Sequence, residues 1–181
     1  MSKKTILAVA IIVTAIMQTT SAQTQEMSKD TSVSANPLHK VISAYLVLKN
    51  ALAKDDGEAA SKSSKALYKA IDKVPMDKLT AAQHTVWIKY MDKLSYDSEH
   101  IKETAETEHQ REHFTSLSKN IYAVVKEFNT NSAELYYQFC PMANDGKGAY
   151  WLSESEKISN PYMGKKMPSC GSIKETIKAN N

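Results

Sequence analysis

Apolar side chains recur every three or four residues over most of the chain, which predicts amphipathic helices. Four such stretches follow one another, at about residues 38–52, 58–73, 80–105 and 106–128. Gly57 and Pro75 break the pattern after the first and second stretches, and Thr80 is a suitable N-cap for the third. No Gly or Pro separates the last two stretches, so we leave open whether they are partly continuous. Four amphipathic helices joined by short links predict a helical bundle.

The pattern changes after Asn129, where three of the five prolines and four of the five glycines occur. The segment ELYYQFC has the aromatic content of a strand, whereas SIKETIKA is expected to form a short terminal helix. Four large aromatic residues supply the apolar surface that the tail needs in order to pack: Tyr136, Tyr150, Trp151 and Tyr162. The predicted fold class is therefore mainly α, a bundle of about four helices with a C-terminal tail of short strands and ordered loops packed over it.

The N-terminal residues have the pattern of an export signal. Lys3 and Lys4 precede an apolar run of about a dozen residues, and small residues follow at Thr20 and Ala22. We expect residues 1–22 to be a signal peptide cleaved after Ala22, residues 23–35 to be a disordered leader, and residues 36–178 to be one domain with its tail at 129–178. The alternative is an uncleaved N-terminal anchor. The expected location is periplasmic or secreted, with no membrane association after cleavage.

Charge and motifs argue against several function classes. The chain has 23 basic and 20 acidic residues, and removal of Lys3 and Lys4 lowers the net charge from +3 to +1. This balance does not favour binding to nucleic acid or to an anionic membrane. Neither a nucleotide-binding glycine loop nor a nucleophile elbow is present, so we do not expect an enzyme.

The tail is rich in sulfur. It contains Cys140 and Met142 in one run and Met163, Met167 and Cys170 in a second. Thiolates and thioethers are soft donors that suit Cu(I), so these residues are candidate copper ligands. Two cysteines in an exported protein also predict a Cys140–Cys170 disulfide, with the methionines filling the core. Free buried thiols are the third alternative.

Two histidines and the only arginine of the chain lie close together in the fourth predicted helix. His109 and His113 are four residues apart, so they share one helix face and can chelate a metal ion. The alternative is a solvated polar face. His113 is the stronger candidate because it precedes Phe114. Arg111 offers a planar fork that can hold carbonyl groups of the tail, or a carboxylate such as Glu154 or Glu156, although its position can also be chance.

Several motifs of the tail resemble a bacterial periplasmic domain family of unknown function. They are Cys-Pro-Met-Ala at 140–143, Gly-Lys-Gly-Ala-Tyr-Trp-Leu-Ser at 146–153, Asn-Pro-Tyr at 160–162 and Cys-Gly at 170–171, and HQREHFTSLS at 109–118 resembles the helical signature of the family. The resemblance extends over about residues 37–177. The family occurs as small secreted proteins and also appended to periplasmic adaptor subunits of copper/silver efflux systems, which implies heavy-metal handling.

Residues and resemblance together predict a periplasmic copper-binding or copper-sequestering module. The expected ligands are Cys140, Met142, Met167, Cys170 and His113, with Met163 and His109 in second rank. Trp151 and Tyr162 are expected to shield the site, and Pro161, Gly146, Gly148 and Gly164 to shape its loops. The expected partners are the metal ion and an efflux adaptor or another envelope protein. The alternative function is a structural or protein-interaction domain closed by the disulfide.

Overall fold

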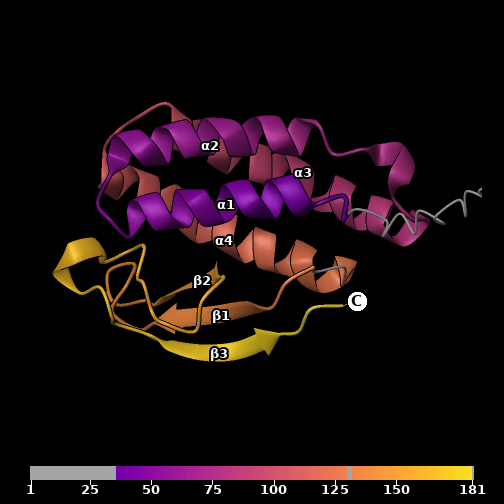
Figure 1. Cartoon of the computed structure of the whole chain (residues 1–181). Coiled ribbons are helices and arrows are strands. Elements are labelled where there is room, and N and C mark those ends of the chain that lie inside the picture. The colour runs from indigo at the N-terminus through magenta and orange to yellow at the C-terminus, as the bar shows by residue number, and fades with distance from the viewer. Residues whose placement is uncertain (1–35, 130–131, 181) are drawn as a thin grey trace, which may run out of the picture. The chain divides into compact units, whose positions relative to one another are not determined.

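The computed structural model describes residues 36–129 and 132–180, and the predicted signal peptide and leader lie outside these residues. Four α-helices fill the first part of the described chain, as predicted. They are α1 (His39–Leu52), α2 (Gly57–Asp72), α3 (Ala81–Lys102) and α4 (Thr107–Phe128), with a 3-10 turn at Met76–Lys78. Consecutive helices pack against each other, and Figure 1 shows them running side by side as a bundle.

Local signals explain where the helices begin and end. The Asp56 side chain accepts a hydrogen bond from the backbone N–H of Ala59 at the start of α2. Thr80 and Gln83 form a reciprocal capping box at the start of α3, so Thr80 caps this helix as predicted. A break at residues 103–106 separates α3 from α4, and these two helices are therefore not continuous.

The tail forms a small antiparallel sheet of three strands. These are β1 (Leu135–Cys140), β2 (Ala149–Ser153) and β3 (Ser172–Ile177), in the order β2-β1-β3, with a 3-10 turn at Gly164–Lys166. The predicted strand in ELYYQFC is confirmed as β1. The predicted terminal helix is wrong, because SIKETI pairs with β1 as an edge strand.

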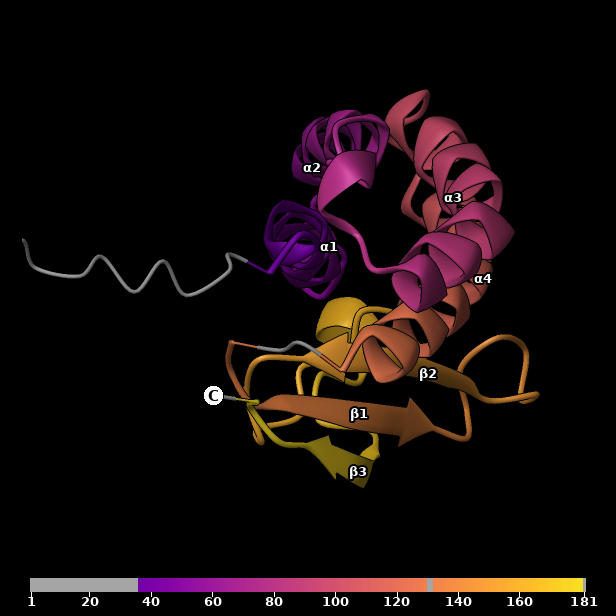
Figure 2. The ribbon, with the colours of Figure 1, turned by 90° about the vertical axis from the view of Figure 1, so that its right-hand side faces the viewer.

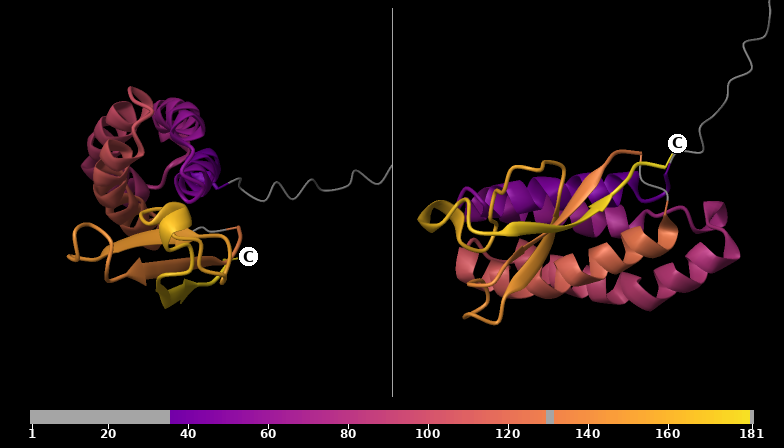
Figure 3. Two further views of the ribbon diagram at one scale, coloured as in Figure 1. Left: turned by 90° about the vertical axis from the view of Figure 1, so that its left-hand side faces the viewer. Right: turned by 90° about the horizontal axis from the view of Figure 1, so that it is seen from below.

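The sheet lies against α1 and α4, on the side of the bundle away from α2 (Figures 1 and 2). The view from below shows the strands crossing under the helices (Figure 3). Tyr45 of α1 is fully buried, and its hydroxyl binds Ser118 of α4 and accepts the N–H of Leu152 in β2. The predicted packing of the tail over the bundle is therefore confirmed.

Arg111 of α4 ties the tail loop to the helices. Its guanidinium donates to the carbonyl of Pro161 at 2.8 Å and to that of Leu52 at 3.0 Å, and it also binds the Asp55 carboxylate. The prediction that Arg111 binds a carbonyl group of the tail is confirmed, but the carboxylate that Arg111 binds is Asp55. Glu154 instead binds Lys49 and Asn50.

Among the described helices, none is both long and apolar enough to cross a membrane. Most of the large apolar side chains of the helices are buried, but Ile88 of α3 is 51% exposed. A single exposed isoleucine is ordinary on a protein surface.

Candidate metal centre

The hairpin of α3 and α4 brings three histidines together. His100 lies in the last turn of α3, and His109 and His113 lie in the first two turns of α4. One ligand nitrogen from each of the three imidazoles lies within 4.8 Å of the other two. The His113 ring stacks on His100 at a centroid distance of 4.6 Å and meets His109 at 4.9 Å. The predicted pair His109 and His113 is thus part of a cluster of three.

A buried carboxylate orients one of these histidines. Oδ1 of Asp97 accepts a hydrogen bond from the hydroxyl of Ser116 at 2.8 Å and lies 3.4 Å from Nδ1 of His113. Burial raises the pKa of Asp97, and the contacts with Ser116 and His113 oppose that rise. With Nδ1 of His113 directed at Asp97, Nε2 is the nitrogen left to bind a metal ion. Carboxylates commonly hold metal-binding histidines in this way.

The cluster is accessible from solvent. The His109 side chain is 43% exposed and the His113 side chain is 18% exposed. The exposed ring of Tyr96 meets the His100 ring edge-on at 4.4 Å and covers one side of the cluster. A metal ion can therefore reach the imidazoles without opening of the helical bundle.

Three neutral imidazoles form a donor set that suits Zn(II), Cu(II) and Ni(II). A tetrahedral ion with metal–nitrogen bonds of about 2.0–2.1 Å holds its nitrogens about 3.4 Å apart. The separations of up to 4.8 Å found here must shorten somewhat, which rotation of the partly exposed His109 side chain allows. Three ligands leave one coordination position for water or for a group from a partner.

The two cysteines lie next to each other in the tail. Their sulfur atoms are 2.7 Å apart, although 30 residues separate them in the sequence. Both are free thiols in the structure, which does not support the expected disulfide. In the part of the chain that is described, neither cysteine belongs to a group of three or more His, Cys, Asp or Glu side chains able to hold one ion, and His113 groups with His100 and His109.

The other predicted site residues surround these positions. Met142 is 54% exposed, whereas Met163 and Met167 are half-buried, and their role as ligands stays a prediction. Trp151 is completely buried and Tyr162 is 7% exposed, and their rings contact each other. Pro161 is buried and presents its carbonyl to Arg111. Three glycines have a positive φ: Gly146 and Gly148 at 79° and Gly164 at 51°.

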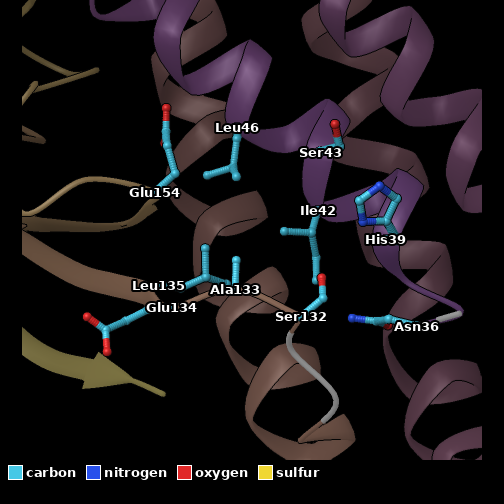
Figure 4. Close-up of a pocket in the computed structure, with 10 residues that line it drawn as sticks. All are labelled: Asn36, His39, Ile42, Ser43, Leu46, Ser132, Ala133, Glu134, Leu135 and Glu154. Carbon is cyan, nitrogen blue, oxygen red and sulfur yellow. The ribbon is translucent and has the colours of Figure 1, made fainter. Parts of the chain in front are cut away.

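A separate cavity of about 230 Å³ lies between α1 and the start of β1 (Figure 4). Ile42 and Leu46 of α1 face Leu135 across it. Its two carboxylates are engaged elsewhere, Glu134 with Lys178 and Glu154 with Lys49. The cavity therefore offers mainly apolar surface, and no histidine of the cluster lines it.

Comparison with known families finds a match for the helical part of the chain. A family model described as "Protein of unknown function (DUF3347)" matches residues 41–133, just over half of the 181 residues. The chain belongs to the DUF3347 family. No curated protein and no solved structure matches it. The DUF3347 match begins at the third residue of α1, covers the rest of the helices with the histidine cluster, and ends before β1. The resemblance described above, as far as residue 177, therefore extends beyond the matched residues.

Sequence reasoning missed His100 and Asp97. The sequence does contain a signal for these two residues. A short link between two helices makes the helices antiparallel neighbours. The end of the third predicted helix must then lie beside the start of the fourth, where His109 and His113 are. Asp97 and His100 are three residues apart and share one face of α3.

Proposed function

We propose that this DUF3347 chain is a copper-binding module of the bacterial cell envelope that binds one Cu(II) ion through His100, His109 and His113. The observation that carries the proposal is the convergence of three imidazole nitrogens within 4.8 Å, with one ring oriented by a buried carboxylate. Nothing in an ordinary solvated helix face requires three histidines from two helices to meet around one point.

Copper is favoured among the divalent ions on chemical grounds. Sites built from nitrogen ligands bind Cu(II) more tightly than Ni(II) or Zn(II), following the Irving–Williams order. The resemblance of the tail to domains appended to copper/silver efflux adaptors supports the same ion. On this basis the module sequesters copper in the envelope or passes it to an efflux adaptor or another envelope protein.

The envelope location is part of the proposal and rests on the sequence of residues 1–22. A basic start, an apolar run of signal-peptide length and small residues at Thr20 and Ala22 support export. Recovery of the chain from the periplasm with Gln23 as its first residue would agree with the proposal. Recovery from the cytoplasm with residues 1–22 still attached would contradict it.

Isothermal titration with Cu(II) tests the site itself. The full chain as purified from the periplasm is compared with His100→Ala, His109→Ala and His113→Ala. Because each variant removes a direct ligand, we expect affinity losses beyond the roughly 10–100-fold that follows loss of a group that only orients a ligand. His84→Ala is the matched control, since His84 is an exposed histidine of α3 outside the cluster. Equal affinity in all four variants and the unaltered chain would overturn the proposal.

A further inference from the structure

The pairing of β1 with β3 brings two thiols together at one end of the sheet. Cys140 is the last residue of β1 and is completely buried, and Cys170 lies two residues before β3 and is partly exposed. Phe139 pairs with Ser172, and this register places the two sulfur atoms 2.7 Å apart. The contact is therefore a consequence of the fold of the tail and not of proximity along the chain.

The backbone around Cys170 is held in place. The N–H of Cys170 donates to the carbonyl of Met167 at 3.2 Å, and the Asn160 side chain donates to the carbonyl of Cys170 at 2.7 Å.

The surroundings of the pair exclude water on one side. Cys140 and Trp151 lie on the same face of the sheet, because Cys140 pairs with Ala149 and Gln138 pairs with Trp151. Trp151 is completely buried. Gly171, the neighbour of Cys170, lies so close to the Trp151 ring that a Cβ there would be 3.0 Å from it. A metal ion can reach the two sulfurs from the side of Cys170, which is partly exposed.

From this geometry we propose that Cys140 and Cys170 form a second metal site, separate from the histidine cluster, which holds one Cu(I) ion between two thiolates. Soft sulfur ligands select Cu(I). Zn(II) sites in proteins have at least three protein ligands, and among the described residues no third His, Cys, Asp or Glu groups with the two thiols. A site limited to two strong ligands suits a monovalent soft ion that accepts low coordination.

Binding releases both S–H protons and leaves one ion between two thiolates. If the bonds are as long as the roughly 2.3 Å of zinc–thiolate bonds, an ion held in line between the two sulfurs places them about 4.6 Å apart, so the present 2.7 Å must widen. Rotation of the partly exposed Cys170 side chain can provide this movement while the buried Cys140 stays in place. The site does not depend on the proposed function, because it uses other residues and the other oxidation state of copper.

An anaerobic titration with Cu(I) alone, in competition with a chromogenic Cu(I) chelator, tests the site. The chelator competition is run on the reduced full chain and on Cys170→Ser, with Ser169→Ala as the matched control at the exposed neighbouring position. We expect the unaltered chain and Ser169→Ala to withdraw one equivalent of Cu(I) from the chelator and Cys170→Ser to withdraw none. Because Cys170 is partly exposed, Cys170→Ser is expected to fold, and circular dichroism verifies that it does.

A variant with His100, His109 and His113 all replaced by Ala separates this site from the histidine site. It should keep its equivalent of Cu(I) while it loses Cu(II). Retention of Cu(I) by Cys170→Ser, or failure of the reduced unaltered chain to take up Cu(I), would overturn the dithiolate site and leave the histidine site untouched. Loss of Cu(I) in the triple histidine variant alone would overturn it equally, since Cu(I) would then occupy the histidines.

Discussion

Asp97 on α3 and His113 on α4 form a contact across the helical hairpin, with Oδ1 of the carboxylate 3.4 Å from Nδ1 of the imidazole. Asp97 is only 4% exposed, so this orienting group is held inside the bundle while His113 reaches its surface. The contact links the helical core, which is the part matched by the family model, to the cluster of three imidazoles. It also supplies a way to weaken metal binding without removal of a ligand.

Replacement of Asp97 by Asn should lower the affinity for Cu(II) by roughly 10–100-fold, because the orienting carboxylate is lost while all three imidazoles remain. Asn keeps the shape of Asp and can still accept the hydrogen bond from Ser116, so the fold should persist. Titration with Cu(II) measures the effect, with the exposed Asp92→Asn on the same helix as the control. An unchanged affinity in Asp97→Asn would show that the carboxylate does not orient His113.

Replacement of Arg111 by Lys should loosen the tail loop. Lys keeps the positive charge but cannot reach Pro161, Leu52 and Asp55 together, as the planar guanidinium does. Loss of hydrogen bonds to a charged group predicts a decrease of about 1–3 kcal/mol in the free energy of unfolding, measured with urea. Lys119→Arg on the exposed face of α4 should change it little. A stability of Arg111→Lys equal to that of the unaltered chain would argue against this anchor.

Gly164 and Gly146 make a matched pair for a steric test. Both have a positive φ, which disfavours alanine by roughly 1–2 kcal/mol. A Cβ at Gly146 would meet nothing within 4 Å, whereas one at Gly164 would overlap the Asp55 carboxylate and approach Arg111. Gly164→Ala should therefore destabilise the chain more than Gly146→Ala in the same urea experiment. Equal losses would show that the loop at Gly164 moves aside without cost.

The contacts between the tail and the helices should weaken in acid. Burial raises the pKa of Asp55, but the bonds from Arg111 and from the backbone of Lys165 outweigh burial and lower it below its usual value. The pKa of Glu154 is likewise lowered, because its bonds to Asn50 and Lys49 outweigh burial.

For a carboxyl with a lowered pKa in the folded state, the stabilisation is complete above the unfolded pKa, near pH 4, and disappears as the pH falls through the folded pKa. The free energy of unfolding should thus decline below about pH 4, and the decline should be shallower in Asp55→Asn. Identical pH profiles for this variant and the unaltered chain would show that Asp55 does not contribute to the loss of stability in acid.

The sequence predicted the helices well because their apolar spacing is regular and because Thr80 marks the start of α3 as a clear N-cap. It failed at β3, where Ile173 and Ile177 stand four residues apart among Lys and Glu, as in an amphipathic helix. Only Ile177 of this edge strand is buried, so no alternating pattern marks it. The pairing of β3 with β1 decides its structure, and that pairing is not visible in the local sequence.

The candidate metal centre was half predictable. His109 and His113 are neighbours on one helix, so their spacing alone indicates a shared face. His100 joins them from another helix, and the closeness of Cys140 to Cys170 depends on the order of strands in the sheet. Contacts of this kind follow from the tertiary arrangement and not from spacing along the chain.

The central claim is that three imidazoles bind one Cu(II) ion, and electron paramagnetic resonance of the copper-loaded full chain tests it most directly. With ¹⁵N-labelled histidine, the account predicts one equivalent of Cu(II) whose spectrum shows coupling to the nitrogens of three imidazoles. His84→Ala should give the same spectrum, and His100→Ala should lose one of the three couplings. A spectrum without imidazole coupling, or one that His100→Ala leaves unchanged, would contradict the account.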